Sequence, residues 1–427
     1  MKVARMRLID RWLGVPVCFL LTVVRRLLGR RPPEQGFALR RILFVKLAEQ
    51  GSTVLAKAAL DRAVGKVGRD NVFFLLFAEN RPILDLMGVI PAQNVIAINA
   101  SNVPRAILSA LAAIYRLRRA GIDAAIDLEF FARSSAALCY LSGAAWRAGY
   151  HCFLGGGAYR GDLMTHRVPF NPYLHASQTF EVLVAALDQP SGKFPAIDMP
   201  PPPLRPCSAA FYPDSRDLEY SRRLVDSSLG DWNGSGLFLL NANASDLVPL
   251  RRWSDQRYVE LARCLLSAQP KASVVFTGAP NEAEAIEQLV RQVDDERCVS
   301  VAGKTTLRQL LALYGLADVL VTNDSGPAHF ATLTPIDVVV LFGPETPRLF
   351  AANSPRTHPV WAETACSPCV SAFNDRNSAC MDNVCMQRIT VKQVFDKVCR
   401  VYESRRSRKG LSSPLPRTPR KALHRAG

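Results

Sequence analysis

A chain of 427 residues is too long for one ordinary hydrophobic core, so two domains are expected. Its composition, 48% hydrophobic and 21% charged residues, excludes a wholly disordered protein. The net charge of +16 lies at the ends, because residues 1–41 and residues 404–427 each carry +8 and the body between them is neutral. This distribution argues against a nucleic-acid-binding core and favours basic ends held against an anionic surface such as a membrane leaflet.

The first segment, residues 1–38, contains an apolar run at 12–24 with arginines on both sides. The run is shorter than the roughly 20 apolar residues that a spanning helix needs. A double arginine stands where a signal peptide would have its small-residue cleavage site. Two alternatives remain, a helix in the membrane interface and a helix packed on the protein's own body. Trp12 and the flanking arginines favour the interface, so we predict a membrane-interface helix and linker over residues 1–38.

The second segment, residues 39–199, alternates short apolar runs with helical patterns. Such alternation predicts βαβ units and a parallel sheet. Strands are expected at 42–45, 72–77, 95–98 and 124–128, and helices at 54–64, 106–119 and 134–141. The glycine-rich stretch 155–161 is either a simple connection or a flexible loop over a cleft.

Residues 200–206 form a proline-rich run, which predicts a stiff linker between two domains. The same α/β pattern restarts in the segment 207–403. Residues 404–427 are rich in Arg, Ser and Pro and are expected to form a basic disordered tail. Strands of the second half are expected at 237–240, 273–277, 298–301, 319–321 and 337–342, and helices at 255–267, 282–292, 307–316 and 328–333.

Polar turns follow the strands of this second half, and ligands of open α/β sheets bind at the carboxyl ends of the strands. In the turn 323–327, Asp324 or Ser325 can cap the next helix, whose free N–H groups favour a phosphate. After the strand at 237–240, small polar residues precede Arg251 and Arg252, which can neutralise a phosphate. The alternatives are an ordinary capped helix and a surface basic pair.

Two further turns are weaker signals. Glu282 stands at a helix start, where its carboxylate either caps the helix or binds ribose hydroxyls. The turn 302–306 contains Gly303-Lys304-Thr305 without the upstream glycine of a phosphate-binding loop, so Thr305 or Thr306 is expected to cap. The set of turns suits a nucleotide diphosphate held by helix ends and arginine, with no obligatory metal.

Eleven cysteines are dispersed except near the C-terminal end, which favours a reducing cytoplasm over a disulfide framework. Cys366 and Cys369 have the spacing of zinc ligands, but the gap between Cys380 and Cys385 is longer. The alternatives are a structural metal, free thiols and a local disulfide, each of which would stabilise a loop.

Several motifs together resemble one family. The stretch NDSGPAHFAT followed by VVVLFGP, with TGAPNE, NANA…RRW and the N-terminal RRILFVKLAEQGSTVLAKAAL before it, is similar to glycosyltransferase family 9 over roughly residues 40–400. The CSPC tail also recurs in that family of heptosyltransferase-type enzymes. The resemblance implies a GT-B fold, in which two Rossmann-like domains face each other across a cleft. It also implies inverting transfer from a nucleotide sugar, ADP-heptose in the best-known members, without a cofactor or metal.

The resemblance also implies roles for individual residues. Lys46 matches the basic residue at the first turn, and Glu282 is near the ribose-binding acid. The family's diphosphate contacts and its nucleotide motif match these positions: Asn243, Arg251 and Arg252 for the diphosphate, and Asp324, Ser325, Gly326 and His329 for the nucleotide.

One departure concerns the general base. The family has Gly-Asp at the first turn, whereas this chain has Gly51-Ser52, and a serine cannot take the proton of an acceptor hydroxyl. Glu49 on the same turn is the predicted substitute, and Glu129 is the second choice. If neither serves, the chain is a non-catalytic, sugar-nucleotide-binding relative that acts as a scaffold, and a more remote alternative is a sugar-nucleotide epimerase.

The prediction is therefore a glycosyltransferase on the cytoplasmic face of the inner membrane. It would use a nucleotide-sugar donor and a lipid-linked saccharide acceptor, as in lipopolysaccharide-core assembly. Its basic ends would hold it peripherally at the membrane, and no nucleic-acid partner is expected.

Overall fold

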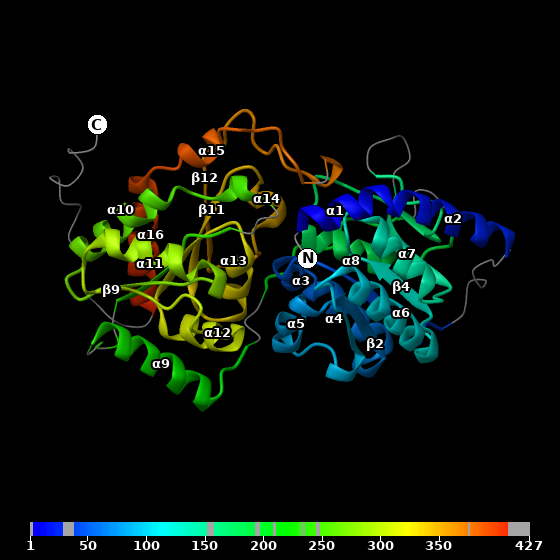
Figure 1. Cartoon of the computed structure of the whole chain (residues 1–427), viewed down its shortest axis with the longest axis horizontal. Coiled ribbons are helices and arrows are strands. Elements are labelled where there is room, and N and C mark those ends of the chain that lie inside the picture. Colours follow the sequence, from blue (N-terminus) through cyan, green and yellow to red (C-terminus); the bar gives the residue numbers. More distant parts are fainter. Residues whose placement is uncertain are drawn as a thin grey trace. The chain divides into compact units, whose positions relative to one another are not determined.

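The computed structural model describes residues 3–28, 38–151, 158–192, 197–207, 211–230, 232, 234, 236–244, 248–374 and 376–408 (Figure 1). The chain forms two compact units. Unit 1 is Met1–Arg205 together with Arg348–Phe350 and Val370–Ser378, and unit 2 is the remainder. Each unit contains its own six-stranded parallel sheet flanked by helices, which confirms the predicted pair of Rossmann-like α/β folds.

The sheet of unit 1 has the order β3-β2-β1-β4-β5-β6. Its strands are β1 (Ile42–Val45), β2 (Val72–Phe77), β3 (Val95–Ile98), β4 (Ala124–Asp127), β5 (Trp146–His151) and β6 (His166–Pro169). Every residue of β1 and β4 is buried, because helices cover both faces of a parallel sheet and its central strands must be apolar throughout. The strand order reverses between β1 and β4, so the carboxyl end of this strand pair is where a doubly wound sheet binds ligands.

The helices of unit 1 are α1 (Val3–Trp12), α2 (Gly14–Leu27), α3 (Gln50–Leu55), α4 (Lys57–Val67), α5 (Arg81–Met87), α6 (Val103–Ala120), α7 (Arg133–Leu141) and α8 (Ala176–Ala186), with 3₁₀ turns η1 (Arg69–Asn71), η2 (Ala78–Asn80) and η3 (Ala92–Asn94). The single helix predicted at 54–64 is two helices, which meet at Ala56. Helix α6 begins three residues before its predicted start, because the Asn102 side chain accepts a hydrogen bond from the Arg105 N–H (2.9 Å) and Pro104 suits the first turn.

The N-terminal helices are attached to unit 1 along one side. The Asp10 carboxylate accepts hydrogen bonds from the N–H groups of Arg133 (3.1 Å) and Ser134 (2.7 Å) and thereby caps α7. Cys18 and Thr22 of α2 are buried. One side of α2 therefore packs on unit 1, as the packed-helix alternative expects. On the opposite side of α2 an apolar row remains exposed: Leu13, Phe19, Leu20, Val23, Val24 and Leu27.

Within the described residues, no helix combines the length and the apolar character that crossing a membrane requires. Part of the predicted linker, residues 29–37, and part of the predicted glycine-rich loop, residues 155–157, lie outside the described residues.

The sheet of unit 2 has the order β12-β11-β10-β7-β8-β9, so its reversal point lies between β7 and β10. Its strands are β7 (Leu237–Asn241), β8 (Ser273–Phe276), β9 (Cys298–Ser300), β10 (Val319–Asn323), β11 (Asp337–Phe342) and β12 (Thr357–Trp361). Its helices are α9 (Ser215–Leu229), α10 (Asp255–Ala268), α11 (Ala283–Val293), α12 (Leu307–Leu316), α13 (Gly326–Phe330), α15 (Val384–Gln387) and α16 (Val391–Arg408), with η4 (Pro249–Arg251), η5 (Pro280–Glu282) and η6 (Ala331–Leu333). The short α14 (Pro347–Phe350) and η7 (Ala372–Asn374) lie in the segments where the chain passes between the units.

The last helix corrects the predicted tail. Helix α16 continues to Arg408, so the disordered segment predicted for 404–427 begins too early. The helix extends this far because its last turn pairs with a buried acid: Asp337 at the start of β11 accepts hydrogen bonds from Arg405 (3.1 Å) and Arg408 (2.7 Å). These arginines belong to the fold of unit 2, whereas residues 409–427 lie outside the described part of the chain.

A buried histidine predicts a pH-dependent stability. His166 is 1% exposed, and its ring nitrogens bond the Thr165 hydroxyl and the Gln189 carbonyl, both at 3.0 Å. Burial lowers the pKa of its imidazole below the ordinary 6.5. The unfolded chain therefore binds more protons, and the free energy of unfolding should decrease as pH falls through 6.5. In His166→Gln, urea unfolding between about pH 7.5 and about pH 5.5 should show a shallower decrease than in the wild type. Equal slopes would contradict the assignment.

Candidate functional site

The turns after β7 and β10 lie at the same edge of the unit 2 sheet. Asn241 is the register partner of Thr322, and Leu341 of β11 is the partner of Asn323. The residues that follow β7 and β10 therefore emerge side by side at the reversal point of the sheet. This is the position that the sequence predicted for a phosphate-binding site.

Asn323 holds these turns together. Its side-chain amide donates to the carbonyls of Ala242 (2.9 Å) and Asn243 (3.3 Å), and its carbonyl oxygen accepts the Trp253 N–H (3.1 Å). Trp253 is buried, and its indole N–H donates to the Ile389 carbonyl. The last residue of β10 thus fixes both the turn after β7 and the segment that carries the two arginines.

The two adjacent arginines differ in their surroundings. Arg251 is 8% exposed, and its guanidinium donates to the Asp324 carbonyl (3.0 Å) and lies 3.6 Å from the Asp324 carboxylate. It also pairs with Glu345 at 2.6 Å. Arg251 is therefore an internal brace that orients Asp324, and its predicted contact with the diphosphate stays a prediction. Arg252 is exposed and donates to the Ala244 carbonyl (3.2 Å), so its guanidinium is the one at the surface of the turn.

The Asn243 side chain gives the clearest sign of a missing ligand. Its amide nitrogen is buried and makes no hydrogen bond within the described part of the chain. A buried donor left in this state is costly and is normally satisfied. Arg252 donates to the carbonyl of Ala244, the residue after Asn243, so an anionic oxygen bound at this edge could satisfy the Asn243 amide and the Arg252 guanidinium together.

The predicted nucleotide motif is placed at this edge, with one correction. Helix α13 begins at Gly326 with Pro327 in its first turn, as expected, but Ser325 does not cap it. The Ser325 hydroxyl instead donates back to the Asn323 carbonyl (3.2 Å). His329 lies on α13 and is 8% exposed, and a side chain at Gly326 would meet the Phe330 ring at 3.0 Å.

Glu282 and Thr306 are helix caps in the structure. The Glu282 carboxylate accepts the Ala279 N–H at 2.7 Å and so caps the turn η5, which leads directly into α11. The Thr306 hydroxyl accepts the Gln309 N–H and caps α12, as the sequence predicted. The capping alternative is thus observed for Glu282, and a contact with ribose remains a prediction.

The corresponding edge of unit 1 carries Lys46, Glu49 and Glu129. The Lys46 side chain is fully buried, and its ammonium group lies 2.9 Å from Glu129 and 3.6 Å from Glu49. The other oxygen of Glu129 accepts the N–H groups of Leu47 (2.7 Å) and Ala48 (3.0 Å). Glu129 therefore closes the turn after β1, which makes it a structural carboxylate and a poor candidate for the general base.

Glu49 has a different environment. Its backbone is in the left-handed region, with φ 71°, which a non-glycine residue adopts only under constraint from its surroundings. Its carboxylate accepts the Ser52 hydroxyl (2.8 Å) and pairs with Arg376. Its side chain keeps 17% of its surface exposed. Glu49 is thus held in place at the edge of the sheet and remains accessible.

Segment 370–378 completes this edge, although it comes from the far end of the chain. It belongs to unit 1, and besides Arg376 it contributes Phe373. The Phe373 ring lies 5.3 Å from Phe170 and 5.9 Å from Phe131. The segment that carries the Glu49 partner Arg376 thus also joins an aromatic cluster of unit 1, and aromatic rings of this kind suit the face of a sugar ring. No sequence pattern singled out Phe373 or Arg376, because only the fold brings them into unit 1.

The four C-terminal cysteines range from exposed Cys366 to buried Cys385. Burial raises the pKa of the Cys385 thiol, and the neighbouring Cys369, Cys366 and Cys380 raise it further. Among the residues that the structure describes, no group of three or more His, Cys, Asp or Glu side chains could hold a metal ion.

Comparisons with known proteins agree with the geometry. The model of glycosyltransferase family 9 (heptosyltransferase) matches residues 111–378. Lipooligosaccharide heptosyltransferase 2 of Haemophilus influenzae is 35% identical over 106 residues, which are 24% of this chain. The chain spans about 30% of the length of that relative.

Solved structures of low sequence identity share the fold. The structure of E. coli ADP-heptose lps heptosyltransferase II has a TM-score of 0.62 at 18% identity, covering 85% of this chain and 98% of its own. That of E. coli heptosyltransferase WaaC with ADP has a TM-score of 0.57 at 16% identity, covering 84% and 99%. Both likenesses extend over the two units.

Proposed function

Because the chain belongs to glycosyltransferase family 9, we propose that it transfers a heptose from ADP-heptose to a lipid-linked saccharide of the lipopolysaccharide core, with inversion at the anomeric carbon. The observation that carries this proposal is the buried Asn243 amide beside Arg252 at the reversal point of the unit 2 sheet. ADP is named with one relative of the same fold and ADP-heptose with another.

In this mechanism the acceptor hydroxyl attacks the anomeric carbon while Glu49 takes its proton. The bond between that carbon and the diphosphate oxygen breaks, and ADP leaves with the electron pair. Arg252 and the Asn243 amide stabilise the charge that develops on the diphosphate, because donors already fixed in position need no reorganisation. Asp324, braced by Arg251, and His329 hold the nucleotide, and Gly326 lets its backbone approach. These groups supply the charge neutralisation, so we propose that no separate cofactor is needed.

The test is turnover by the full-length chain with ADP-heptose and a heptose-accepting core oligosaccharide. We expect release of ADP in equal amount to glycosylated product, and NMR of the product should show the inverted anomeric configuration. Retention would contradict the mechanism. Release of nucleotide with free sugar in the absence of acceptor would favour the epimerase alternative, and binding of ADP-heptose without any turnover would favour the scaffold.

We also propose that the protein is peripheral to the inner face of the cytoplasmic membrane. The exposed apolar row of α2 supports this, since Phe19, Leu20 and Leu27 are 56–81% exposed and arginines border the helix. Removal of residues 1–28 should shift the protein from the membrane fraction to the supernatant at low salt, as measured by fractionation. A full-length chain found mainly in the supernatant at low salt would contradict this proposal.

A further inference from the structure

A second apolar row on the surface of unit 1 is not explained by the reaction. Helix α6 buries Ala113 and Leu117 on one side. On its outer side, four large apolar side chains are 56–67% exposed: Ile107, Leu108, Leu111 and Tyr115. Their spacing places them along one stripe of the helix. An exposed stripe of this kind marks a surface that binds something apolar.

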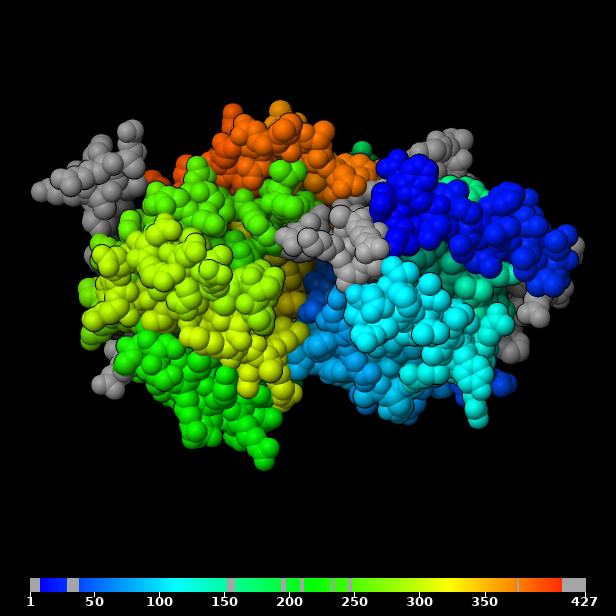
Figure 2. All heavy atoms as spheres, viewed as in Figure 1, coloured from blue at the N-terminus to red at the C-terminus, as the bar shows by residue number. Residues whose placement is uncertain are grey.

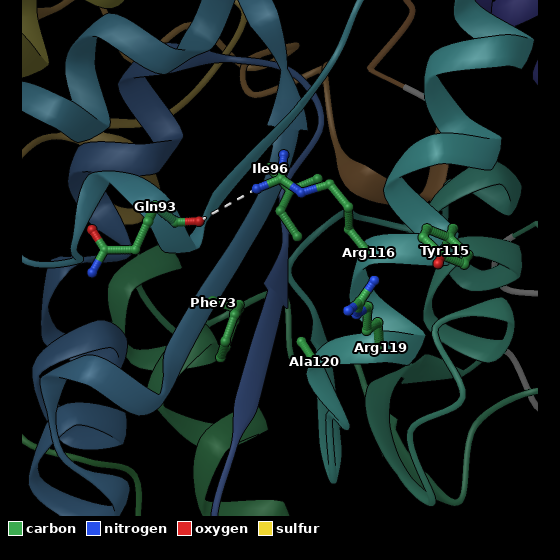
Figure 3. Close-up of a pocket in the computed structure, with 7 residues that line it drawn as sticks. All are labelled: Phe73, Gln93, Ile96, Tyr115, Arg116, Arg119 and Ala120. Atoms are coloured by element: carbon green, nitrogen blue, oxygen red, sulfur yellow. Dashed lines mark hydrogen bonds between the residues drawn. The ribbon is translucent and has the colours of Figure 1, made fainter.

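The flanks of the row are basic. Helix α6 contains Arg105, Arg116, Arg118 and Arg119 and no acidic residue. Arg118 donates to the Leu141 carbonyl (2.8 Å) and Arg116 to the Gln93 carbonyl (3.5 Å). Arg116 and Arg119 border a pocket of about 360 Å³ between α6 and the β2–β3 edge of the sheet. Figure 3 shows both side chains coming from α6, opposite Phe73 and Ile96. The pocket thus combines an apolar floor with two guanidinium groups, which suits the phosphate and upper acyl chain of an anionic lipid.

The α6 row lies on the same face of unit 1 as the N-terminal helices. Side chains of α2, α6 and α7 enter one hydrophobic core on this side of the sheet, including Cys18, Leu117 and Cys139. The space-filling view shows α1–α2 in dark blue and α6 in cyan on one face of the unit (Figure 2). Helices α2 and α6 and their exposed apolar rows therefore belong to one side of unit 1.

We propose that α6 is a second membrane-contact element, and that the outer face of α2 and α6 docks on an anionic phospholipid leaflet. The leaflet fits better than a protein partner for two reasons: the α6 row lies on the same side of the unit 1 sheet as the apolar row of α2, and α6 itself carries four arginines and no acid. The inference rests on the membrane association proposed for α1–α2 and adds to it an orientation, with the α6 side of unit 1 facing the lipid.

The experiment is co-sedimentation of the full-length chain with phosphatidylcholine vesicles, with and without phosphatidylglycerol. The double variant Leu108→Gln/Leu111→Gln should bind vesicles about tenfold more weakly, since two inserting side chains become polar. Arg116→Gln/Arg119→Gln should lose about fivefold per charge on anionic vesicles and little on neutral ones. The control Tyr212→Gln/Met381→Gln replaces side chains of unit 2 that are 83% and 99% exposed, and it should bind as the wild type does.

The vesicle-binding results distinguish the role of α6 from that of the N-terminal helices. All the substituted side chains are exposed, so circular dichroism and melting curves should match those of the wild type. Unchanged vesicle binding by both α6 variants, with loss on removal of residues 1–28, would overturn the role of α6 and leave the N-terminal association intact. A wild-type chain that does not bind vesicles would overturn both. If light scattering shows that the α6 variants abolish a dimer instead, the occupant is a second copy of the chain and the leaflet is wrong.

Discussion

Replacing Glu49 with Gln should lower kcat by about 10²- to 10⁴-fold, the range expected when a general base is removed. The amide keeps the shape of the side chain and can still accept the Ser52 hydroxyl, but it cannot take a proton. The donor site in unit 2 is unaffected, so the Kd for ADP should not change. Steady-state turnover and calorimetric titration of ADP separate the two effects.

Two matched variants show whether the loss is specific to Glu49. Glu79→Gln changes an exposed acid whose backbone carbonyl is bonded by Gln50, and it should leave turnover unchanged. Glu129→Gln removes the carboxylate that pairs with Lys46, and its main effect should be a lower melting temperature. If Glu49→Gln retains full turnover, Glu49 is not the base. A loss confined to Glu129→Gln, with stability unchanged, would move the role to that residue.

Arg251→Gln should destabilise unit 2 by about 3–5 kcal/mol, the cost of removing one partner from a buried ion pair. Two carboxylates depend on this guanidinium: Asp324, with 4% of its side chain exposed, and Glu345, with 1%. Because Asp324 belongs to the predicted nucleotide motif, ADP binding should fall together with stability. Urea unfolding with and without ADP measures both quantities.

The neighbouring arginine is the matched control. Arg252→Gln lies on the exposed side of the turn, so the free energy of unfolding should change by less than about 0.5 kcal/mol. The Kd for ADP should nevertheless rise about 10- to 100-fold, the change expected when a hydrogen bond to a charged group is lost. If Arg251→Gln leaves stability unchanged, or if Arg252→Gln unfolds the protein, the assignment of brace and ligand contact is reversed.

Much of the fold could be predicted because its central strands are apolar throughout. The runs at Ile42–Val45 and Asp337–Phe342 are buried on both faces of a sheet, which the sequence expresses directly. Strands β5 and β6 were missed because Arg147, His151 and His166 interrupt their apolar pattern. In the fold these polar side chains find hydrogen-bond partners; Arg147, for example, donates to the Leu163 carbonyl. Such partners cannot be recognised from the local sequence pattern.

The candidate site was predictable at the level of turns. Asn243, Asp324 and Glu49 follow strands β7, β10 and β1, and the register places these strand ends at the reversal points of the two sheets. Ion pairs between residues far apart in the sequence were not predictable. Arg251 appeared equivalent to Arg252 until Glu345 was placed beside it, and Arg376 reaches Glu49 across 327 positions of sequence. The one available signal was Glu345 itself, a carboxylate three residues past the buried strand that ends at Phe342.

The most direct measurement is the melting temperature of the full-length chain and of Arg252→Gln across a panel of ADP-, GDP-, UDP- and TDP-sugars. A ligand at 100 times its Kd stabilises the folded state by about 2.7 kcal/mol, which is readily seen as a higher melting temperature. We predict that ADP-heptose raises the wild-type melting temperature the most and raises that of Arg252→Gln much less. Equal shifts in both proteins, or no shift with any nucleotide sugar, would contradict a diphosphate held at the β7–β10 edge of unit 2.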